Sequence, residues 1–248
     1  MYDTISITCV TCYFFCFHFI CVSLKVKEGM NIMKKQGKKL LCIGLLMLAV
    51  FIVFTMAVKA IDVQAIGVNG SAVGFATLNN WFHKLTGVDF ILYHITDWLG
   101  LAPIGVCILF GFKGLVQLIQ RKSVFKVDRD IIFLGVYYFM VISCYVVFEA
   151  FPINYRPVLV NGVLEASYPS STTLLVITIM PALAFYCIRK CNRQAGKIVA
   201  VFANTFTLAV IFARVLSGVH WLTDIIGAML LGSGLFYIYK GVVLLYDN

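Results

Sequence analysis

The stretch MKKQGKKLLCIGLLMLAVFIVFTMAV, residues 33–58, decides the class of fold that this chain adopts. Lysines crowd its start, and the run from 40 to 58 that follows carries no charged side chain. An α-helix needs about 20 apolar residues to cross roughly 30 Å of hydrocarbon, so this run is long enough to span a membrane. A basic flank before such a run is typical of the first helix of a membrane protein.

Similar apolar runs recur through the rest of the chain. Of its residues 61% are hydrophobic and only 12% are charged, and the mean hydropathy is +0.95. The runs lack the alternation of apolar and polar residues that marks a membrane β-barrel, so helices are expected. The sequence therefore predicts an all-α, polytopic membrane protein with six spanning helices near residues 40–58, 99–119, 131–150, 171–188, 198–215 and 222–244.

The net charge of +9 comes mainly from short basic clusters between the apolar runs. The clusters do not form the continuous basic face that a nucleic-acid backbone needs, so no nucleic-acid partner is expected. Because they fall at alternate connections, the positive-inside rule places both termini in the cytoplasm. The clusters comprise Lys34, Lys35, Lys38 and Lys39, then Arg121, Lys122, Lys126 and Arg129, and then Arg189, Lys190, Arg193 and Lys197.

Residues 1–29 do not fit this plan. Their Cys- and Phe-rich run, from Thr8 to Val22, is shorter than a spanning helix needs, which leaves a signal-like segment as one interpretation. The other is a mistranslated leader, because purine-rich codons for Lys-Glu-Gly before Met30 would resemble a bacterial ribosome-binding sequence. We expect the membrane domain to cover residues 30–248 and the source to be bacterial.

The first external connection, residues 59–98, contains apolar side chains at helical spacing. These side chains are Leu78, Trp81, Phe82 and Leu85. The pattern predicts a short amphipathic helix lying in the membrane interface. The alternative is an ordered loop packed on the bundle.

The pattern Arg214-x5-His220-x3-Asp224 straddles the end of the fifth run and the start of the sixth. On a helix, His220 and Asp224 would share a face, so that the carboxylate holds one imidazole nitrogen protonated and leaves the other free. A nucleophilic histidine is prepared in this way. We therefore interpret the pair as a candidate catalytic site rather than as packing residues.

Two further segments reach the same external side in the predicted topology. Arg156 supplies a planar fork suited to phosphate oxygens, and its position conflicts with the positive-inside rule, as does that of Arg214. Ser170 and Ser171 open the fourth run, where free N–H groups and the helix dipole favour an anion. Two arginines, a helix N-terminus and a His–Asp pair together indicate phosphoryl transfer through a phosphohistidine.

In these residues the chain resembles the type 2 phosphatidic acid phosphatase (PAP2) superfamily of membrane phosphatases. The family's motifs are Lys-x6-Arg-Pro, Pro-Ser-Gly-His and Ser-Arg-x5-His-x3-Asp, and the match runs from about residue 149 to 224. The resemblance implies a PAP2-like bundle in which His220 attacks phosphorus and Asp224 orients it. It also implies that the phosphate oxygens are held by the side chains of Arg156, Ser170 and Arg214 and by the backbone N–H of Ser171.

The chain departs from the family's motifs at three positions. Glu149 replaces the first-motif lysine, Thr172 replaces the second-motif histidine, and Ala213 replaces a serine. The missing histidine is the family's general acid, a role worth roughly 10²- to 10⁴-fold in rate, and a threonine hydroxyl cannot supply it near neutral pH. A lipid monophosphate leaving from a pyrophosphate needs no proton, so we expect any activity to favour pyrophosphates.

We predict a lipid phosphatase that acts at the outer face on a phospholipid or an isoprenoid pyrophosphate resembling undecaprenyl pyrophosphate. We expect no metal or cofactor, because arginines would stabilise the charge. The alternative is a catalytically weakened relative that binds or carries a phospholipid head group. A channel or transporter unrelated to phosphate is the third reading, disfavoured by the lack of inverted repeats and intramembrane charge pairs.

Overall fold

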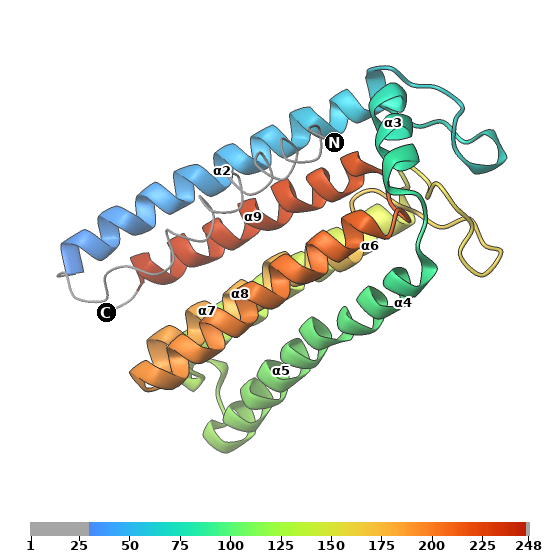
Figure 1. Cartoon of the computed structure of the whole chain (residues 1–248). Helices are drawn as coiled ribbons and strands as arrows, with labels where there is room; N and C mark the ends of the chain where they lie inside the picture. The colour runs from blue at the N-terminus through green and yellow to red at the C-terminus, as the bar shows by residue number, and fades with distance from the viewer. Residues whose placement is uncertain (1–29, 247–248) are drawn as a thin grey trace.

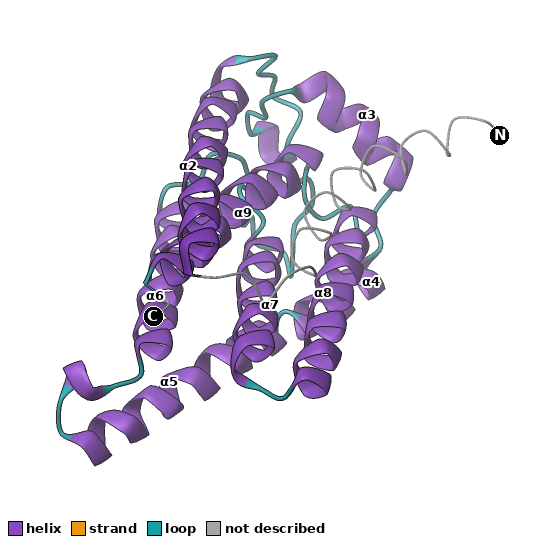
Figure 2. Ribbon diagram, turned by 90° about the vertical axis from the view of Figure 1, so that its left-hand side faces the viewer, coloured by secondary structure: helices purple, strands orange, loops and turns teal. Residues whose placement is uncertain are grey.

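The computed structural model describes residues 30–246, so both interpretations of residues 1–29 lie outside the described part. The described residues form helices joined by loops, with isolated β-bridges in the loops (Figure 2). The long helices are α2 (Met30–Ala60), α5 (Leu101–Arg121), α6 (Arg129–Ala150), α7 (Ser171–Lys190), α8 (Arg193–Leu216) and α9 (Leu222–Leu245). The short ones are η1 (Val68–Gly70), α3 (Ala76–Thr86), α4 (Phe90–Leu99) and η2 (Val124–Lys126).

Six segments of the described chain are long and apolar enough to cross a membrane, which confirms the predicted number and order of spans. The second one differs from the prediction of 99–119, because α4 leads into α5 and the apolar segment runs over 32 residues, Phe90–Arg121. Gly100 joins the two helices in a helical conformation, with φ −62° and ψ −16°. Residues 90–98 are therefore helical, although the sequence had placed them in an external connection.

Helices α7 and α9 form the centre of the bundle. Within the most apolar 18-residue window of each, 72% of α7 and 78% of α9 is buried, against 17% for α2 and 11% for the α4–α5 segment. The core between them is largely aromatic and aliphatic, with Tyr137, Tyr168, Leu174 and Phe236 almost fully buried. The outer helices expose large apolar side chains, as helices in contact with lipid do.

Helices α2 and α9 lie side by side in opposite directions (Figure 1), in near contact of their backbones. A Cβ atom built on Gly44 would lie 2.8 Å from the carbonyl oxygen of Gly234, and one built on Gly37 would lie 2.9 Å from that of Gly241. Neither distance leaves room for a side chain. Small residues permit this close approach between membrane helices, where the hydrophobic effect does not drive association.

The two ends of the bundle differ in charge and in the length of their connections. The connections 61–75, 151–170 and 217–221 gather at one end, and the start of α2 and the end of α9 lie at the other (Figure 1). The basic clusters lie at the end of the bundle where α2 starts, as their position at alternate connections of the sequence predicted. Which side of the membrane each end occupies stays a prediction.

The amphipathic segment is helical, as α3, and its apolar side chains point away from the bundle. Leu78, Trp81 and Leu85 are exposed, whereas Asn79 is fully buried and donates from Nδ2 to the hydroxyl of Thr223 at 3.0 Å. A polar residue thus fixes α3 to the first turn of α9. The helical prediction is confirmed, and the interfacial location stays a prediction.

We expect Gly44→Leu to destabilise the protein, because the larger side chain would force α2 away from α9. Overpacking of this kind costs about 1–3 kcal/mol, and each kcal/mol lowers Tm by about 2–4 °C in a chain of this size. Thermal unfolding of the purified protein in detergent measures the change. Gly105→Leu on α5 is the matched control, since a Cβ there meets nothing within 4 Å. Equal Tm values for the two variants would contradict the close packing.

Candidate active site

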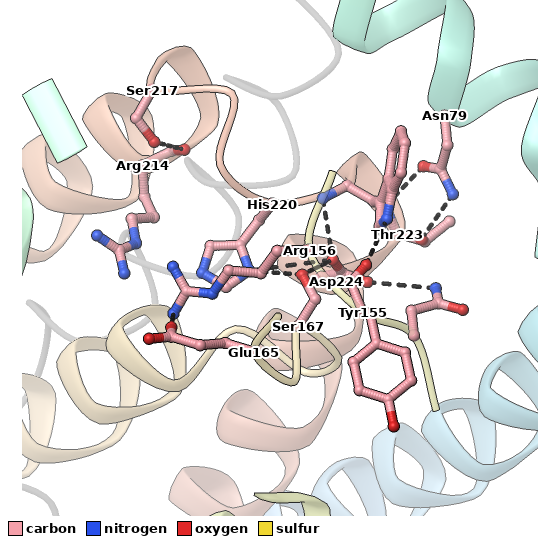
Figure 3. A network of polar contacts seen from close by, with 12 residues as sticks. Asn79, Tyr155, Arg156, Glu165, Ser167, Arg214, Ser217, His220, Thr223 and Asp224 are labelled. Atoms are coloured by element: carbon pink, nitrogen blue, oxygen red, sulfur yellow. Dashed lines mark hydrogen bonds and ion pairs between the residues drawn. The ribbon is translucent and has the colours of Figure 1, made fainter. Parts of the chain in front are cut away.

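His220 and Asp224 lie close together but make no direct hydrogen bond, and the hydroxyl of Ser167 connects them (Figure 3). His220 precedes α9 rather than lying on it, so the two residues do not share a helical face as expected. The distance from Nδ1 of His220 to Oδ2 of Asp224 is 3.9 Å, too long for a hydrogen bond. The hydroxyl of Ser167 lies 2.9 Å from that Nδ1 and 2.5 Å from that Oδ2.

The Asp224 carboxylate is fully buried in the first turn of α9, where it holds three segments together. Besides the Ser167 hydroxyl, it accepts the backbone N–H of Trp221 at 2.9 Å and the amide of Asn154 at 3.4 Å. The carbonyl oxygen of Asp224 accepts the N–H of Ser170 at 3.1 Å. One residue thus connects the start of α9, the segment 151–170 and the start of α7.

The imidazole of His220 is buried, and its Nε2 has no hydrogen-bond partner among the described residues. Burial lowers the pKa of His220 well below its ordinary value of about 6.5, and the guanidinium groups of Arg156 and Arg214 lower that pKa further. The ring is therefore neutral at neutral pH, with one nitrogen unengaged. A neutral imidazole with a free nitrogen is the form that attacks phosphorus.

Arg156 lies in the connection 151–170, which folds back on itself. Its backbone N–H donates to the carbonyl oxygen of Glu165 at 3.1 Å, and its Nη2 forms an ion pair with the Glu165 carboxylate at 3.0 Å. The guanidinium also lies over the ring of Tyr93, 5.5 Å from the ring centroid. Its Nε and Nη1 are buried without a hydrogen-bond partner in the described part of the chain.

Arg214 lies in the last turn of α8 and is held by helix α4. Its Nη1 donates to the hydroxyl of Thr96 at 2.9 Å and to the carbonyl oxygen of Tyr93 at 3.4 Å. The guanidinium lies 4.8 Å from the Tyr93 ring centroid, and its Nη2 is 3.7 Å from the carboxylate of Asp97. The same aromatic ring therefore contacts both arginines. Nε and Nη2 of Arg214 find no hydrogen-bond acceptor among the residues described.

The N-terminus of α7 completes the arrangement. Ser170, the residue before its first turn, is fully buried, and its hydroxyl has no hydrogen-bond partner within the described residues. The N–H groups of the first helical turn, which begins at Ser171, have no partner within the helix. Leaving a buried polar atom unpaired costs about 1–3 kcal/mol. Several such atoms near one nucleophilic nitrogen indicate a site for an anion with several oxygens, such as phosphate.

The two replaced motif positions have different surroundings. Glu149 is exposed near the end of α6 and lines a narrow pocket together with Ser167 and Ser171, while the carboxylate that pairs with Arg156 belongs to Glu165. Thr172 is buried, with its methyl group against Gly100 at the junction of α4 and α5. Neither residue offers an imidazole or an ammonium group, the groups that the family's motifs have at these two positions.

The structure brings together all six predicted site residues and adds six that the sequence did not single out. The predicted residues are His220, Asp224, Arg156, Ser170, Ser171 and Arg214. The additions are Tyr93, Thr96 and Asp97 of α4, and Asn154, Glu165 and Ser167 of the connection before α7. Closeness to the second motif could have drawn attention to Ser167. Nothing in the sequence marks α4, because its packing against α8 is long-range.

In the described residues no group of three His, Cys, Asp or Glu side chains is placed to hold a metal ion. The positive groups that face His220 are instead the two guanidinium groups. The fold and the site together define a class: a helical membrane protein with buried, unpaired polar groups beside a histidine at one end of its bundle.

Residues 132–245 match the model of the PAP2 superfamily. A segment of 77 residues is 30% identical to phosphatidylglycerophosphatase B of Bacillus subtilis (strain 168), covering 30% of this chain and 38% of that relative. The match thus spans well under half of the relative's length. The match over residues 132–245 supports the resemblance to the PAP2 superfamily that the motifs had indicated.

The whole bundle resembles the crystal structure of a transmembrane PAP2 type phosphatidylglycerolphosphate phosphatase from Bacillus subtilis. The TM-score is 0.56 at 19% identity, and the likeness covers 80% of this chain and 94% of the other. At this identity the likeness concerns the fold. It confirms the predicted all-α, PAP2-like transmembrane bundle and makes this chain a multi-pass membrane protein.

We expect the His220 ring to stay neutral as the pH falls through 6.5, because burial and two guanidinium groups lower its pKa. Arg156→Gln removes one of these charges and should raise the pKa of His220 toward its ordinary value. NMR titration of protein with ¹⁵N-labelled histidine, assigned by loss of the His220 signal in His220→Ala, measures both values. Arg121→Gln, at the opposite end of the bundle, should leave the pKa unchanged; an equal pKa in Arg156→Gln would contradict this account.

Proposed function

We propose that this protein is a lipid phosphatase that transfers a phosphoryl group from a membrane lipid to His220 and then to water. The observation that carries the proposal is the set of buried, unpaired polar atoms around His220. These are Nε2 of His220, the Ser170 hydroxyl and the free nitrogens of Arg156 and Arg214. A bound phosphate would satisfy them with its oxygens.

The reaction has two displacements at phosphorus. In the first, Nε2 of His220 forms a bond to phosphorus while the bond to the leaving lipid oxygen breaks, and the lipid departs with the electron pair. In the second, water replaces the imidazole and releases inorganic phosphate. Arg156 and Arg214 would stabilise the charge on the phosphoryl oxygens in both steps, as guanidinium groups do in other phosphoryl transfers.

The leaving group is the point at which this chain differs from the family's motifs. With Thr172 and Glu149 in place of histidine and lysine, the first displacement lacks a proton donor for an alkoxide. A lipid monophosphate leaves as a stable anion without one. We therefore propose an isoprenoid pyrophosphate, resembling undecaprenyl pyrophosphate, as the preferred substrate. The phospholipid named for the Bacillus relative is the natural comparison.

The alternative function is binding or carriage of a phospholipid head group without efficient turnover. The observation that favours it is the replacement of both motif residues, with Thr172 packed against Gly100 instead of facing the solvent. The anion site would be the same in both cases. Turnover is what separates the two functions.

We expect the purified wild-type protein to release inorganic phosphate from a polyprenyl pyrophosphate faster than from phosphatidylglycerol phosphate or phosphatidic acid. His220→Ala should lower the rate by at least about 10³-fold, because it removes the nucleophile. During turnover, the labelled terminal (β) phosphoryl group of the pyrophosphate should appear on His220 as an acid-labile, alkali-stable adduct. The unfolding temperature of the variant controls for loss of fold.

Equal or faster turnover of phosphatidic acid would contradict the preference for pyrophosphates. Binding of the lipid without phosphate release would favour the alternative function. In that case Thr172→His combined with Glu149→Lys should increase the rate of phosphate release by about 10²- to 10⁴-fold, the usual contribution of a general acid.

We also propose that the site faces the outside and that both termini are cytoplasmic, because the basic clusters lie at the opposite end. A cysteine introduced at Val163, which is exposed beside the site, should react with a membrane-impermeant thiol reagent in intact cells. A cysteine at Phe125, exposed at the other end in η2, should react only after lysis. The reverse pattern would overturn the orientation.

A further inference from the structure

We propose that Ser167 is a positioning residue, which holds His220 in the tautomer that leaves Nε2 free to attack. The inference rests on the proposed function, in which His220 is the nucleophile. Ser167 lies outside the three motifs, yet it makes the contact with Nδ1 of His220 that the motifs would have assigned to Asp224. Three observations carry it, namely the hydrogen-bond distances, the way Ser167 is fixed and the unengaged Nε2.

The ionised form of Asp224 sets the direction of each hydrogen bond. An ionised carboxylate can only accept, so the Ser167 hydroxyl donates its one proton to Asp224, 2.5 Å away. The serine oxygen then has only lone pairs to offer to Nδ1 of His220, at 2.9 Å. Nδ1 must therefore carry the imidazole proton, and Nε2 holds the free electron pair.

Ser167 is fixed from a second direction. It is buried, and its backbone N–H donates to the carbonyl oxygen of Asn154 at 2.9 Å. The amide of Asn154 in turn reaches Asp224 at 3.4 Å. The serine, the asparagine and the carboxylate thus form a closed set of contacts in which the hydroxyl has little freedom to turn.

The free nitrogen lies where the proposed reaction needs it. Nε2 of His220 is buried without a hydrogen-bond partner in the described residues, as are nitrogens of Arg156 and Arg214. When Nε2 bonds to phosphorus, the ring becomes positively charged, and its proton stays on Nδ1. The serine oxygen, polarised by the Asp224 carboxylate, then accepts a stronger hydrogen bond from Nδ1–H. No proton leaves the ring in this step.

The direct pair expected from the sequence would not account for these contacts. At 3.9 Å the Asp224 oxygen is too far from Nδ1 for a hydrogen bond, so the contacts that select between the two tautomers come from Ser167. Its hydroxyl lies 2.9 Å from Nδ1, and its backbone also forms a contact with the ring that raises the pKa of His220. The charged groups around the ring, Arg156, Arg214 and Asp224, affect its charge but do not donate to or accept from it at hydrogen-bond distance.

The tautomer can be measured in the resting protein, without turnover. In the full chain with ¹⁵N-labelled histidine, NMR should show His220 as the Nδ1–H form in the wild type and as a mixture with Nε2–H in Ser167→Ala. Ser167→Thr, which keeps the hydroxyl, should retain the Nδ1–H form. Ser233→Ala removes another buried serine hydroxyl, on α9, and is the matched control. An unchanged tautomer in Ser167→Ala would overturn the proposal.

Kinetics then test the role in the reaction. Ser167→Ala should lower kcat by about 10- to 100-fold, the range found when a group that orients a metal-bound imidazole is lost, and leave KM within about twofold. Ser167→Thr should recover most of kcat. Ser167→Cys, a weaker donor, should fall between the two and serves if Ser167→Thr does not fold. A raised KM at constant kcat would instead indicate a role in binding and would overturn the proposal.

The two measurements separate this inference from the proposed function. If the wild type releases no phosphate, the proposed function fails, yet the NMR comparison still decides whether Ser167 sets the tautomer. If the wild type is active and Ser167→Ala changes neither the tautomer nor kcat, the proposed function survives and the role of Ser167 does not.

Discussion

The arrangement of the site depends on one buried carboxylate. Asp224 lies in the apolar interior of a membrane bundle, where an unpaired charge would be strongly destabilising. Its oxygens must therefore be satisfied, and the donors that satisfy them come from the connection before α7 and from the start of α9. Satisfying this one group brings together Ser167, Trp221 and Asn154, and with them the loop that carries Arg156.

The proposed anion site shows the opposite condition, since its polar atoms have no hydrogen-bond partners in the described residues. Stability would be higher if the free nitrogens of Arg156 and Arg214 and the Ser170 hydroxyl had partners. The aromatic ring of Tyr93 and the carboxylates of Glu165 and Asp97 compensate part of the positive charge, while Nε2 of His220 has no hydrogen-bond partner in the described residues. The fold thus satisfies the carboxylate beside His220 and leaves unpaired the groups that, in the proposed function, would bind the phosphate.

Sequence reasoning was effective where the signal is local or periodic. The length of the apolar runs predicted the six spans, and the spacing in Arg214-x5-His220-x3-Asp224 selected the histidine and the aspartate that the Ser167 hydroxyl connects. It failed where geometry depends on packing between distant segments. The prediction that His220 and Asp224 share a helical face was wrong because α9 begins only at Leu222. The contribution of α4 was not predicted, because it depends on the contact of α4 with α8.

The helix formed by α4 and α5 has a mechanical consequence. Its 32 residues would extend about 48 Å at 1.5 Å per residue, well beyond the roughly 30 Å of hydrocarbon in a typical bilayer. Such a segment responds to bilayer thickness by tilting or bending, and its first part holds Arg214 through Thr96 and Tyr93. The thickness of the surrounding membrane therefore bears directly on the position of Arg214, one of the two arginines of the proposed phosphate site, and lipid composition becomes a physical variable of that site.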